Sequence, residues 1–303
     1  MTDPPAVRFE AAVRRFREVS ALDGLTMDVP AGSVFGLVGD NGAGKTTAIH
    51  ALLGLLPLER GRVSAFGMDP AARGTELRRV TGFFPERDQP YGWMKLSTLL
   101  QMARHAFPRW DTDREAEWLD RFELDPCKRV KEMSKGMVAK AKLLVVLGRR
   151  VRLAVLDEPI NGLDPTGREA LDEGIRELAA GGSTVLLSSH SLEELSRVAT
   201  HLGVMAAGRC VHAGPMEDLW ERWGLIEDPG GGPETLPGVE VLGSAVGRGG
   251  GRRWLVADRH AAALEALGEE GPGRTLRAPT LAECFSLLRT RAAVSRKGAA
   301  LAA

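Results

Sequence analysis

The chain has 303 residues, of which 44% are hydrophobic and 26% charged, a composition typical of a soluble protein with one large domain and room for a smaller one. Lysine plus arginine and aspartate plus glutamate number 40 each, so charge gives no sign of a nucleic-acid partner, and three widely separated cysteines argue against a disulfide framework or a zinc site. No apolar run approaches the roughly 20 residues of a membrane span and the N-terminus lacks the pattern of a signal peptide, so we expect a protein of a reducing compartment that does not cross a membrane by itself.

The stretch from residue 7 to about 208 alternates short apolar runs with amphipathic segments, the pattern of an α/β protein. Buried strands are expected at 33–38, 152–156 and 184–187, and helices at 45–53 and 165–180. Asp164 and Pro165 open the second helix with an N-cap residue and a proline in the first turn. Ser191 with Glu194 predicts a capping box for a further helix.

Changes in composition divide the chain into a large domain over 5–225 and a smaller C-terminal unit over 239–295. Within the large domain, apolar residues recur at helical spacing between about 85 and 150, which predicts a mostly helical insert. The glycine- and proline-rich segment around 226–238 predicts a linker between the two parts. Residues 296–303 are expected to form a disordered tail.

The C-terminal unit is predicted to be α+β. Its expected elements are a hairpin of strands at 239–242 and 254–257 and helices at 261–267 and 281–288. Thr280 and Glu283 predict a capping box at the start of the last helix.

A glycine-rich segment lies between the first predicted strand and the helix that follows it, and it fits the phosphate-binding pattern G-x-x-x-x-G-K-[ST]. Glycines allow backbone N–H groups to approach phosphates closely, and the helix N-terminus adds a positive dipole end. The expected nucleotide-binding residues are Gly39, Asp40, Asn41, Gly42, Ala43, Gly44, Lys45, Thr46 and Thr47. Lys45 should contact the β- and γ-phosphates and Thr46 should ligate Mg²⁺. A chance glycine-rich turn is the alternative, and the strand–turn–helix context argues against it.

Polar residues follow two of the other predicted strands. An acidic residue at a buried strand end is costly unless it meets a cation, so Asp157 suits the Mg²⁺ shell and Glu158 is placed to polarise a water for attack on the γ-phosphate. His190 follows the third strand, and ligands of open α/β sheets bind at the carboxyl ends of strands. His190 is therefore a candidate contact to the γ-phosphate or the attacking water. The alternatives are a turn with solvated acids and a structural histidine.

These residues, together with the segment Met133–Met137, resemble the nucleotide-binding domain of ABC transporters. Met-Ser-Lys-Gly-Met is similar to the family's signature segment LSGGQ, in the SKGM variant of bacterial ABC-2-type exporter ATPases. The resemblance implies that Ser134, Lys135 and Gly136 approach the γ-phosphate held by the opposite subunit. A predicted helix begins here, so its dipole would favour an anion, although serine is also a common N-cap of ordinary helices.

Other positions match family motifs in the expected order. The segment ending in Asp164 resembles the D-loop, which crosses the dimer interface in the family, and Phe16 stands where an aromatic residue stacks on adenine. A core phenylalanine is the alternative for Phe16. Glu86 replaces the usual glutamine of the Q-loop; its carboxylate could still reach Mg²⁺ but cannot donate an amide hydrogen bond. Residues 280–285 resemble the close of many ABC-2 subunits.

The resemblance covers about residues 5–220 and implies a P-loop NTPase fold of the ABC type, with ATP and Mg²⁺ as cofactors. It further implies a second ABC subunit, identical or homologous, and a multi-span membrane permease, with the chain on the cytoplasmic face of the membrane and no nucleic acid bound. Trp93 and Met94 are candidate permease contacts, with the core of the insert as the alternative. The function implied is export of a substrate powered by ATP hydrolysis; the alternative is a soluble ABC-type ATPase with a regulatory or nucleic-acid-linked role. The permease handles the substrate, so these residues do not identify it.

Overall fold

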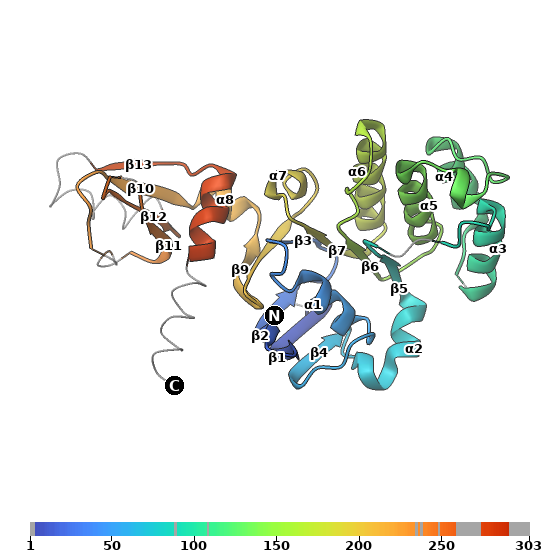
Figure 1. Ribbon diagram of the computed structural model, residues 1–303, viewed down its shortest axis with the longest axis horizontal. Coiled ribbons are helices and arrows are strands. Elements are labelled where there is room, and N and C mark those ends of the chain that lie inside the picture. The colour runs from blue at the N-terminus through green and yellow to red at the C-terminus, as the bar shows by residue number, and fades with distance from the viewer. Residues whose placement is uncertain are drawn as a thin grey trace.

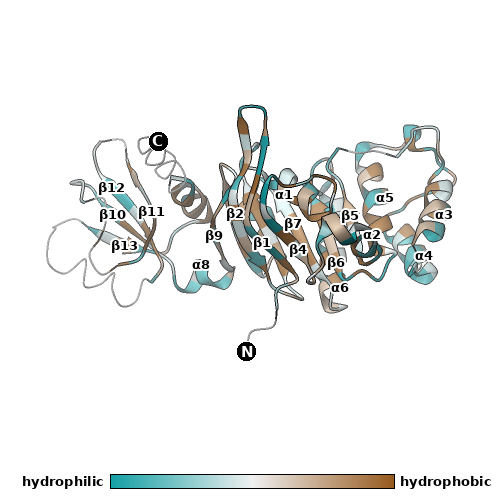
Figure 2. Cartoon of the chain, turned by 90° about the horizontal axis from the view of Figure 1, so that it is seen from below, coloured by the Kyte–Doolittle hydropathy of each residue, from teal (hydrophilic) through white to brown (hydrophobic). Residues whose placement is uncertain are grey.

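The computed structural model describes residues 4–87, 90–107, 109–233, 236, 239–247, 249–258 and 274–290. These residues form sheets of six, three and four strands. The helical insert consists of α3 (Leu96–Ala106), α4 (Thr112–Arg121), a 3₁₀ turn (Val130–Glu132) and α5 (Lys135–Leu147). Figures 1 and 2 both place this insert at one end of the molecule and the four-stranded sheet at the other. Within the described ranges, no helix is long and apolar enough to span a bilayer.

The central sheet has six strands in the order β5-β6-β7-β3-β8-β9. Its strands are β3 (Val34–Gly39), β5 (Thr81–Phe84), β6 (Leu153–Asp157), β7 (Thr184–Ser189), β8 (His201–Ala206) and β9 (Arg209–Pro215). All neighbours pair in parallel except β9, which is antiparallel to β8. Every residue of β3, β6 and β7 is buried, as is typical of parallel strands covered on both faces. The three strands predicted from apolar runs are confirmed.

Alternate residues of the central strands face two separate cores. The layers on either side contain α1 (Lys45–Leu52), α2 (Pro70–Val80), α6 (Pro165–Ala180), α7 (Leu192–Leu195) and the three-stranded sheet β2-β1-β4, formed by β1 (Val7–Phe16), β2 (Val19–Val29) and β4 (Arg60–Ala65). Leu37 and Leu186 pack toward α1 and the three-stranded sheet. Val38 and Leu187 belong to the opposite core, with α5 and α6. The carboxyl ends of the strands are thus held rigidly from both sides.

The insert is anchored by Trp118 and Phe122, which are buried and whose ring centroids lie 4.9 Å apart. The buried carboxylate of Glu115 accepts a hydrogen bond from Trp110 Nε1 at 2.6 Å and pairs with Arg104. A buried charge is tolerated when it is paired in this way. These helices occupy the stretch in which a helical insert was expected.

The helix starts predicted in the large domain are confirmed in one case and only half confirmed in the other. Asp164 Oδ1 accepts from Gly167 N at 2.7 Å and caps α6 as expected. At α7, Ser191 Oγ accepts from Glu194 N at 3.3 Å, but the Glu194 carboxylate accepts from Ser189 Oγ at 2.8 Å and not from the Ser191 backbone. Because Ser189 also accepts from Ser191 N at 2.9 Å, it takes the place of the reciprocal half of the box.

The C-terminal unit is built on an antiparallel sheet in the order β11-β12-β10-β13. Helix α8 (Glu217–Glu221) precedes its strands β10 (Gly224–Asp228), β11 (Val241–Val246), β12 (Arg252–Val256) and β13 (Thr275–Arg277). The predicted hairpin is present as β11 and β12. The linker expected at 226–238 is wrong at its start, because residues 226–228 belong to β10, which pairs with β12 and β13. Leu225 and Ile226 explain the difference, since both are buried and the glycine-rich composition begins only after them.

The helix expected at 281–288 is present and spans residues 281–290. Its capping box is complete, because Thr280 N donates to Glu283 Oε2 at 2.8 Å and Glu283 N donates to Thr280 Oγ1 at 3.3 Å. A hydrogen bond from Arg277 holds the pKa of the Glu283 carboxyl at about 2. The helix expected at 261–267 and the tail expected at 296–303 lie outside the described residues.

The C-terminal unit shares a hydrophobic core with the large domain. Leu202 and Val204 of β8 belong to the same buried cluster as Trp223, Leu255 and Leu287 of the C-terminal part. Shared apolar burial resists rotation of one part against the other, so the C-terminal unit is seated on the large domain, that is, packed against it through this shared core.

Trp118 and Trp93 offer a matched test of the insert core. Trp118→Ala removes a side chain with 0% exposure and should lower the free energy of unfolding by about 3–5 kcal/mol. Trp93→Ala removes a side chain that is 68% exposed and should change the free energy of unfolding by less than about 0.5 kcal/mol. Denaturant unfolding followed by circular dichroism measures both; equal losses would contradict this packing.

Candidate nucleotide-binding site

The glycine-rich turn between β3 and α1 follows a path that requires glycine. Gly44, directly before α1, has φ +104°, and a Cβ there would lie 2.3 Å from the carbonyl oxygen of Ala21. Gly42 also has a positive φ, +81°. L side chains rarely adopt this conformation, so the turn can wrap tightly only with glycine at these positions. Helix α1 then begins at Lys45, as predicted.

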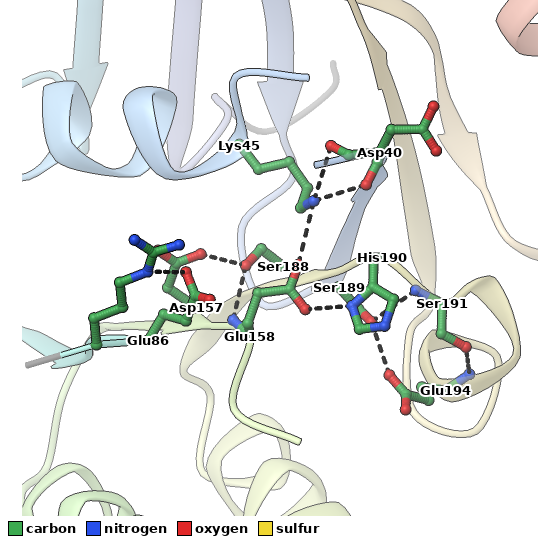
Figure 3. Close-up of polar contacts among 12 residues, drawn as sticks. Asp40, Lys45, Glu86, Asp157, Glu158, Ser188, Ser189, His190, Ser191 and Glu194 are labelled. Atoms are coloured by element: carbon green, nitrogen blue, oxygen red, sulfur yellow. Dashed lines mark hydrogen bonds and ion pairs between the residues drawn. The ribbon is translucent and has the colours of Figure 1, made fainter. Parts of the chain in front are cut away.

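Lys45 is buried and its ammonium lies at the centre of the site. Its Nζ donates to Gly39 O at 2.7 Å and lies 3.2 Å from Glu158 Oε1 (Figure 3). The side chains of both ions are below 10% exposed, at 6% and 8%. Two opposite charges this deep require each other, because an isolated buried charge is very costly.

Asp157 is the last residue of β6 and Glu158 follows it, and both share one partner on β7. Ser188 Oγ donates to Asp157 Oδ1 at 2.6 Å and accepts from Glu158 N at 2.9 Å. The register of the parallel pair places Ser188 directly beside Asp157. Glu158 has φ +47°, a left-handed conformation that costs a non-glycine residue about 1–2 kcal/mol. Such strain is concentrated at functional sites, and here it accompanies the turn of the chain out of the strand.

His190 completes the cluster from the end of β7. Its Nδ1 lies 2.9 Å from Glu158 Oε2, so the Glu158 carboxylate stands between the imidazole and the Lys45 ammonium (Figure 3). The loop that carries His190 is held by the hydrogen bonds among Ser189, Ser191 and Glu194. The structure therefore brings together the three side chains predicted from three different strand ends.

A cavity of about 450 Å³ opens over this cluster. Its lining contains most of the predicted nucleotide-binding residues and consists of Val19, Ala21, Asp40, Asn41, Gly42, Gly44, Lys45, Thr46, Thr47, Glu86, Arg87, Glu158, Asn161 and His190. Phe16 and the Asp157 side chain are not part of this lining. The volume and the mixture of backbone, cationic and hydroxyl groups suit a phosphorylated ligand.

The signature segment lies elsewhere on the same chain. Ser134 is the N-cap of α5, and its Oγ accepts a hydrogen bond from Met137 N at 3.2 Å. The alternative that Ser134 serves as an ordinary helix N-cap is therefore correct for its contacts within this chain. A Cβ at Gly136 would lie 3.4 Å from Gly162 O, which places the segment beside the predicted D-loop. Ser134, Lys135 and Gly136 do not line the cavity described above.

Comparison with known proteins decides the family. The ABC transporter profile matches residues 22–161. The Daunorubicin resistance ATP-binding protein DrrA3 of Streptomyces coeruleorubidus is 32% identical over 300 residues, covering 92% of this chain and 94% of that protein. The Nod factor export ATP-binding protein I of Rhizobium meliloti is 32% identical over 257 residues, covering 80% of this chain and 77% of that protein. The chain belongs to the ABC transporter family.

A solved structure agrees with this assignment. A chain described as the ATP-binding subunit of an ABC transporter superposes with a TM-score of 0.66 at 28% identity, covering 71% of this chain and 91% of its own. The described fold is thus that of an ABC nucleotide-binding domain, and the chain is an ATPase subunit of an ABC transporter.

Phe16 is 46% exposed, so the core alternative is wrong, and the Arg14 guanidinium lies 5.1 Å from its ring centroid. Glu86 lies at the cavity edge with its carboxylate 3.8 Å from the guanidinium of Arg87. Its backbone carbonyl is 3.5 Å from Lys142 Nζ of α5, which links the Q-loop position to the signature helix.

The oxygen atoms near the cavity fit a magnesium ion. Mg²⁺ prefers oxygen ligands and is usually held by one or two protein groups together with substrate phosphates. Thr46 and Glu86 line the cavity, and Asp157 lies next to Glu158 in the chain with its orientation set by Ser188. Among the described residues, no group of three or more histidine, cysteine or acidic side chains forms a metal cluster. The oxygen atoms of Thr46, Glu86 and Asp157 are compatible with an ion that arrives with the nucleotide.

Sequence reasoning missed Ser188, which the sheet places between both acidic residues. The position of this serine beside an acidic strand end can be recognised only once the pairing of β6 and β7 is known.

Ser188→Ala should lower ATP turnover by about 10–100-fold, because partners that orient catalytic and metal-binding groups typically contribute that much. Phosphate release by the purified chain measures it. Ser196→Ala, which removes a hydroxyl bonded to Glu193 O, is the control; equal losses in both variants would contradict a positioning role for Ser188.

Proposed function

We propose that the chain binds MgATP in the cavity at the carboxyl ends of β3, β6 and β7 and hydrolyses it there. The observation that carries this proposal is the Glu158 carboxylate held between Lys45 and His190 beside the glycine-rich turn. These groups supply a cation for phosphate, a base for water and a proton-bearing ring within one site.

The residues have different roles in this reaction. The turn amides and the α1 N-terminus bind the phosphates, and Lys45 moves from Glu158 toward the β- and γ-phosphates when the stronger anion enters. Thr46 and Asp157 would hold Mg²⁺, with Glu86 near it, and the bound ion would supply positive charge to the phosphate oxygens. Glu158 polarises the attacking water, and His190 keeps the carboxylate in position and contacts the γ-phosphate.

We infer that the site is completed by a second ABC subunit. One chain offers a phosphate cavity that its own signature segment does not line. Separately, it offers the N-terminus of α5, with a serine cap, the partly buried Gly136 and a positive dipole end. Two chains arranged head to tail would place Ser134, Lys135 and Gly136 of one over the γ-phosphate of the other. Asp164 and its loop, which adjoin the signature segment, would cross the interface. ATP would then join the subunits, and hydrolysis would release them.

The insert carries the proposed contact to a membrane permease. Tyr91 and Trp93 are 69% and 68% exposed and stack with ring centroids 5.9 Å apart. Met94, at 4% exposure, belongs to the core, so the core alternative holds for Met94 and not for Trp93. An exposed aromatic pair between the Q-loop position and α3 suits a docking surface. The chain would then sit on the cytoplasmic face of the membrane and power export of a substrate through an ABC-2-type permease. The drug-resistance and Nod factor export relatives support the export role.

Glu158→Gln tests the base. The amide keeps the size of the side chain but cannot accept a proton, so ATP turnover should fall by about 100-fold or more while ATP binding persists. Phosphate release and isothermal titration with ATP measure the two quantities, and size-exclusion chromatography with ATP should show an accumulated dimer. Turnover close to that of the unchanged protein would place the base elsewhere.

Lys45→Ala tests the phosphate contact. Removal of a charge-assisted hydrogen bond should weaken ATP affinity by about 10–100-fold. Lys140→Ala, at a position of α5 outside the cavity lining, is the control and should keep the affinity. Unchanged ATP binding by Lys45→Ala would refute the assignment of the glycine-rich turn.

Trp93→Ala tests the permease surface. The variant should keep its fold and the ATPase activity of the isolated chain, but should lose the co-purification with a membrane permease that the unchanged protein is expected to show. Met102→Ala, also an exposed apolar position of the insert at 56%, is the matched control. Retention of the membrane partner by Trp93→Ala would move the contact elsewhere on the insert.

A further inference from the structure

The C-terminal helix reaches the phosphate-binding turn. Arg289, near the end of the helix over residues 281–290, forms an ion pair with the Asp40 carboxylate. Asp40 is the second residue of the glycine-rich turn and lines the nucleotide cavity. The two side chains are 45% and 49% exposed, so the pair lies at the cavity rim. The C-terminal unit thereby contributes a charge to a site that otherwise belongs to the large domain.

The helix that carries Arg289 is held firmly on its other face. Cys284, Leu287 and Leu288 are at most 1% exposed and belong to the core shared with the large domain. Thr290 Oγ1 donates to Ser244 O at 2.7 Å, and a Cβ at Gly243 would lie 2.1 Å from Leu287 O. This backbone approach leaves no room for any side chain at Gly243, so strand β11 and the helix lie in direct contact.

A second contact, independent of Asp40, orients the Arg289 side chain. Its guanidinium lies 5.3 Å from the ring centroid of Phe285, one helical turn earlier, and Phe285 packs against the shared core. A guanidinium over an aromatic face loses less conformational freedom when it forms a further ion pair. The contact to Asp40 therefore follows from how the helix is seated.

The charge at Asp40 matters because of its position. In Figure 3 its carboxylate points away from Lys45, while its backbone carbonyl oxygen faces the ammonium at 3.4 Å. A negative side chain on the turn that binds a triphosphate repels the ligand, and a half-exposed site screens this repulsion only partly. A guanidinium paired with that carboxylate cancels most of the repulsion and restrains the turn.

We propose that Arg289 is a positioning residue of the nucleotide site: by neutralising and holding Asp40, it makes ATP affinity depend on the seating of the C-terminal helix. This inference rests on the proposed nucleotide site. A ligand or partner that lifts the helix from the shared core would weaken ATP binding without touching the cavity, and ATP binding would by reciprocity favour the seated helix.

The test uses the full chain and isothermal titration with Mg²⁺ and the non-hydrolysable ATP analogue adenylyl imidodiphosphate. Arg289→Ala should weaken the affinity by about fivefold, the upper range for an exposed ion pair. Arg289→Lys, which keeps the charge, should stay within about twofold of the unchanged protein. The loss in Arg289→Ala should shrink at about 1 M salt, where charges are screened beyond about 3 Å. A purely structural role would not respond to salt in this way.

Two further variants separate charge from seating. In an Asp40→Asn background, Arg289→Ala should change the affinity by less than about twofold relative to Asp40→Asn alone, because no carboxylate is left uncompensated. Gly243→Ala should weaken the affinity by about as much as Arg289→Ala, because its Cβ collides with the helix. Arg73→Ala breaks an exposed ion pair with Glu76 on α2 and is the control, with unchanged affinity expected.

The outcomes distinguish this inference from the proposed function. If Lys45→Ala loses affinity and Arg289→Ala keeps it, the nucleotide site stands and the role of Arg289 is refuted. An equal loss from Arg289→Ala whether residue 40 is Asp or Asn would also refute it. Binding of the analogue by Lys45→Ala with unchanged affinity would instead refute the nucleotide site on which the inference rests.

Discussion

The Glu158 carboxylate between the Lys45 ammonium and the His190 imidazole is the interaction on which the rest of the site depends. Each of the three residues follows a different strand of the central sheet, and the neighbouring order β6-β7-β3 brings those strand ends together. The arrangement tolerates a buried carboxylate because the Lys45 ammonium and the His190 imidazole compensate its desolvation, while the Ser188 hydroxyl accepts a hydrogen bond from the Glu158 backbone N–H. The same ion pair can be exchanged when nucleotide binds. A nucleotide phosphate would compete with Glu158 for Lys45 and leave the Glu158 carboxylate free to act on water.

Helix α5 connects the parts of the ATPase that must act together. Its first turn carries the signature segment, and its middle carries Lys142, which donates to Pro85 O and lies 4.3 Å from the Phe84 ring centroid. The segment around Glu86 is thereby tied to the same helix that would meet the γ-phosphate of a second subunit. A helix of 13 residues moves as a rigid body, so a displacement at one end is felt at the other. Glutamate in place of glutamine changes the side chain at this junction but not these backbone contacts.

The C-terminal unit is part of the ATPase in a physical sense and not only in the order of the chain. Its buried residues continue the core of the large domain, and its last described helix reaches the phosphate-binding turn through Arg289. Exposed ion pairs contribute little to stability. Their effect on a bound anion is different, because a charge at the rim of a phosphate site acts on several ligand charges at once.

The sequence by itself determined the features that depend on local hydrogen bonding and periodicity: the glycine-rich turn, the buried strands, the Asp164 cap, and the choice of Lys45, Glu158 and His190. Only the tertiary structure decided which of these meet and what supports them. Four contacts join residues through strand register or packing. They are Ser188 beside Asp157, the strand at 224–228 that overlaps the start of the expected linker, the replacement of half a capping box by Ser189, and Arg289 on Asp40. Such contacts depend on how distant segments pair, and the residue types along one segment do not determine which partner another segment supplies.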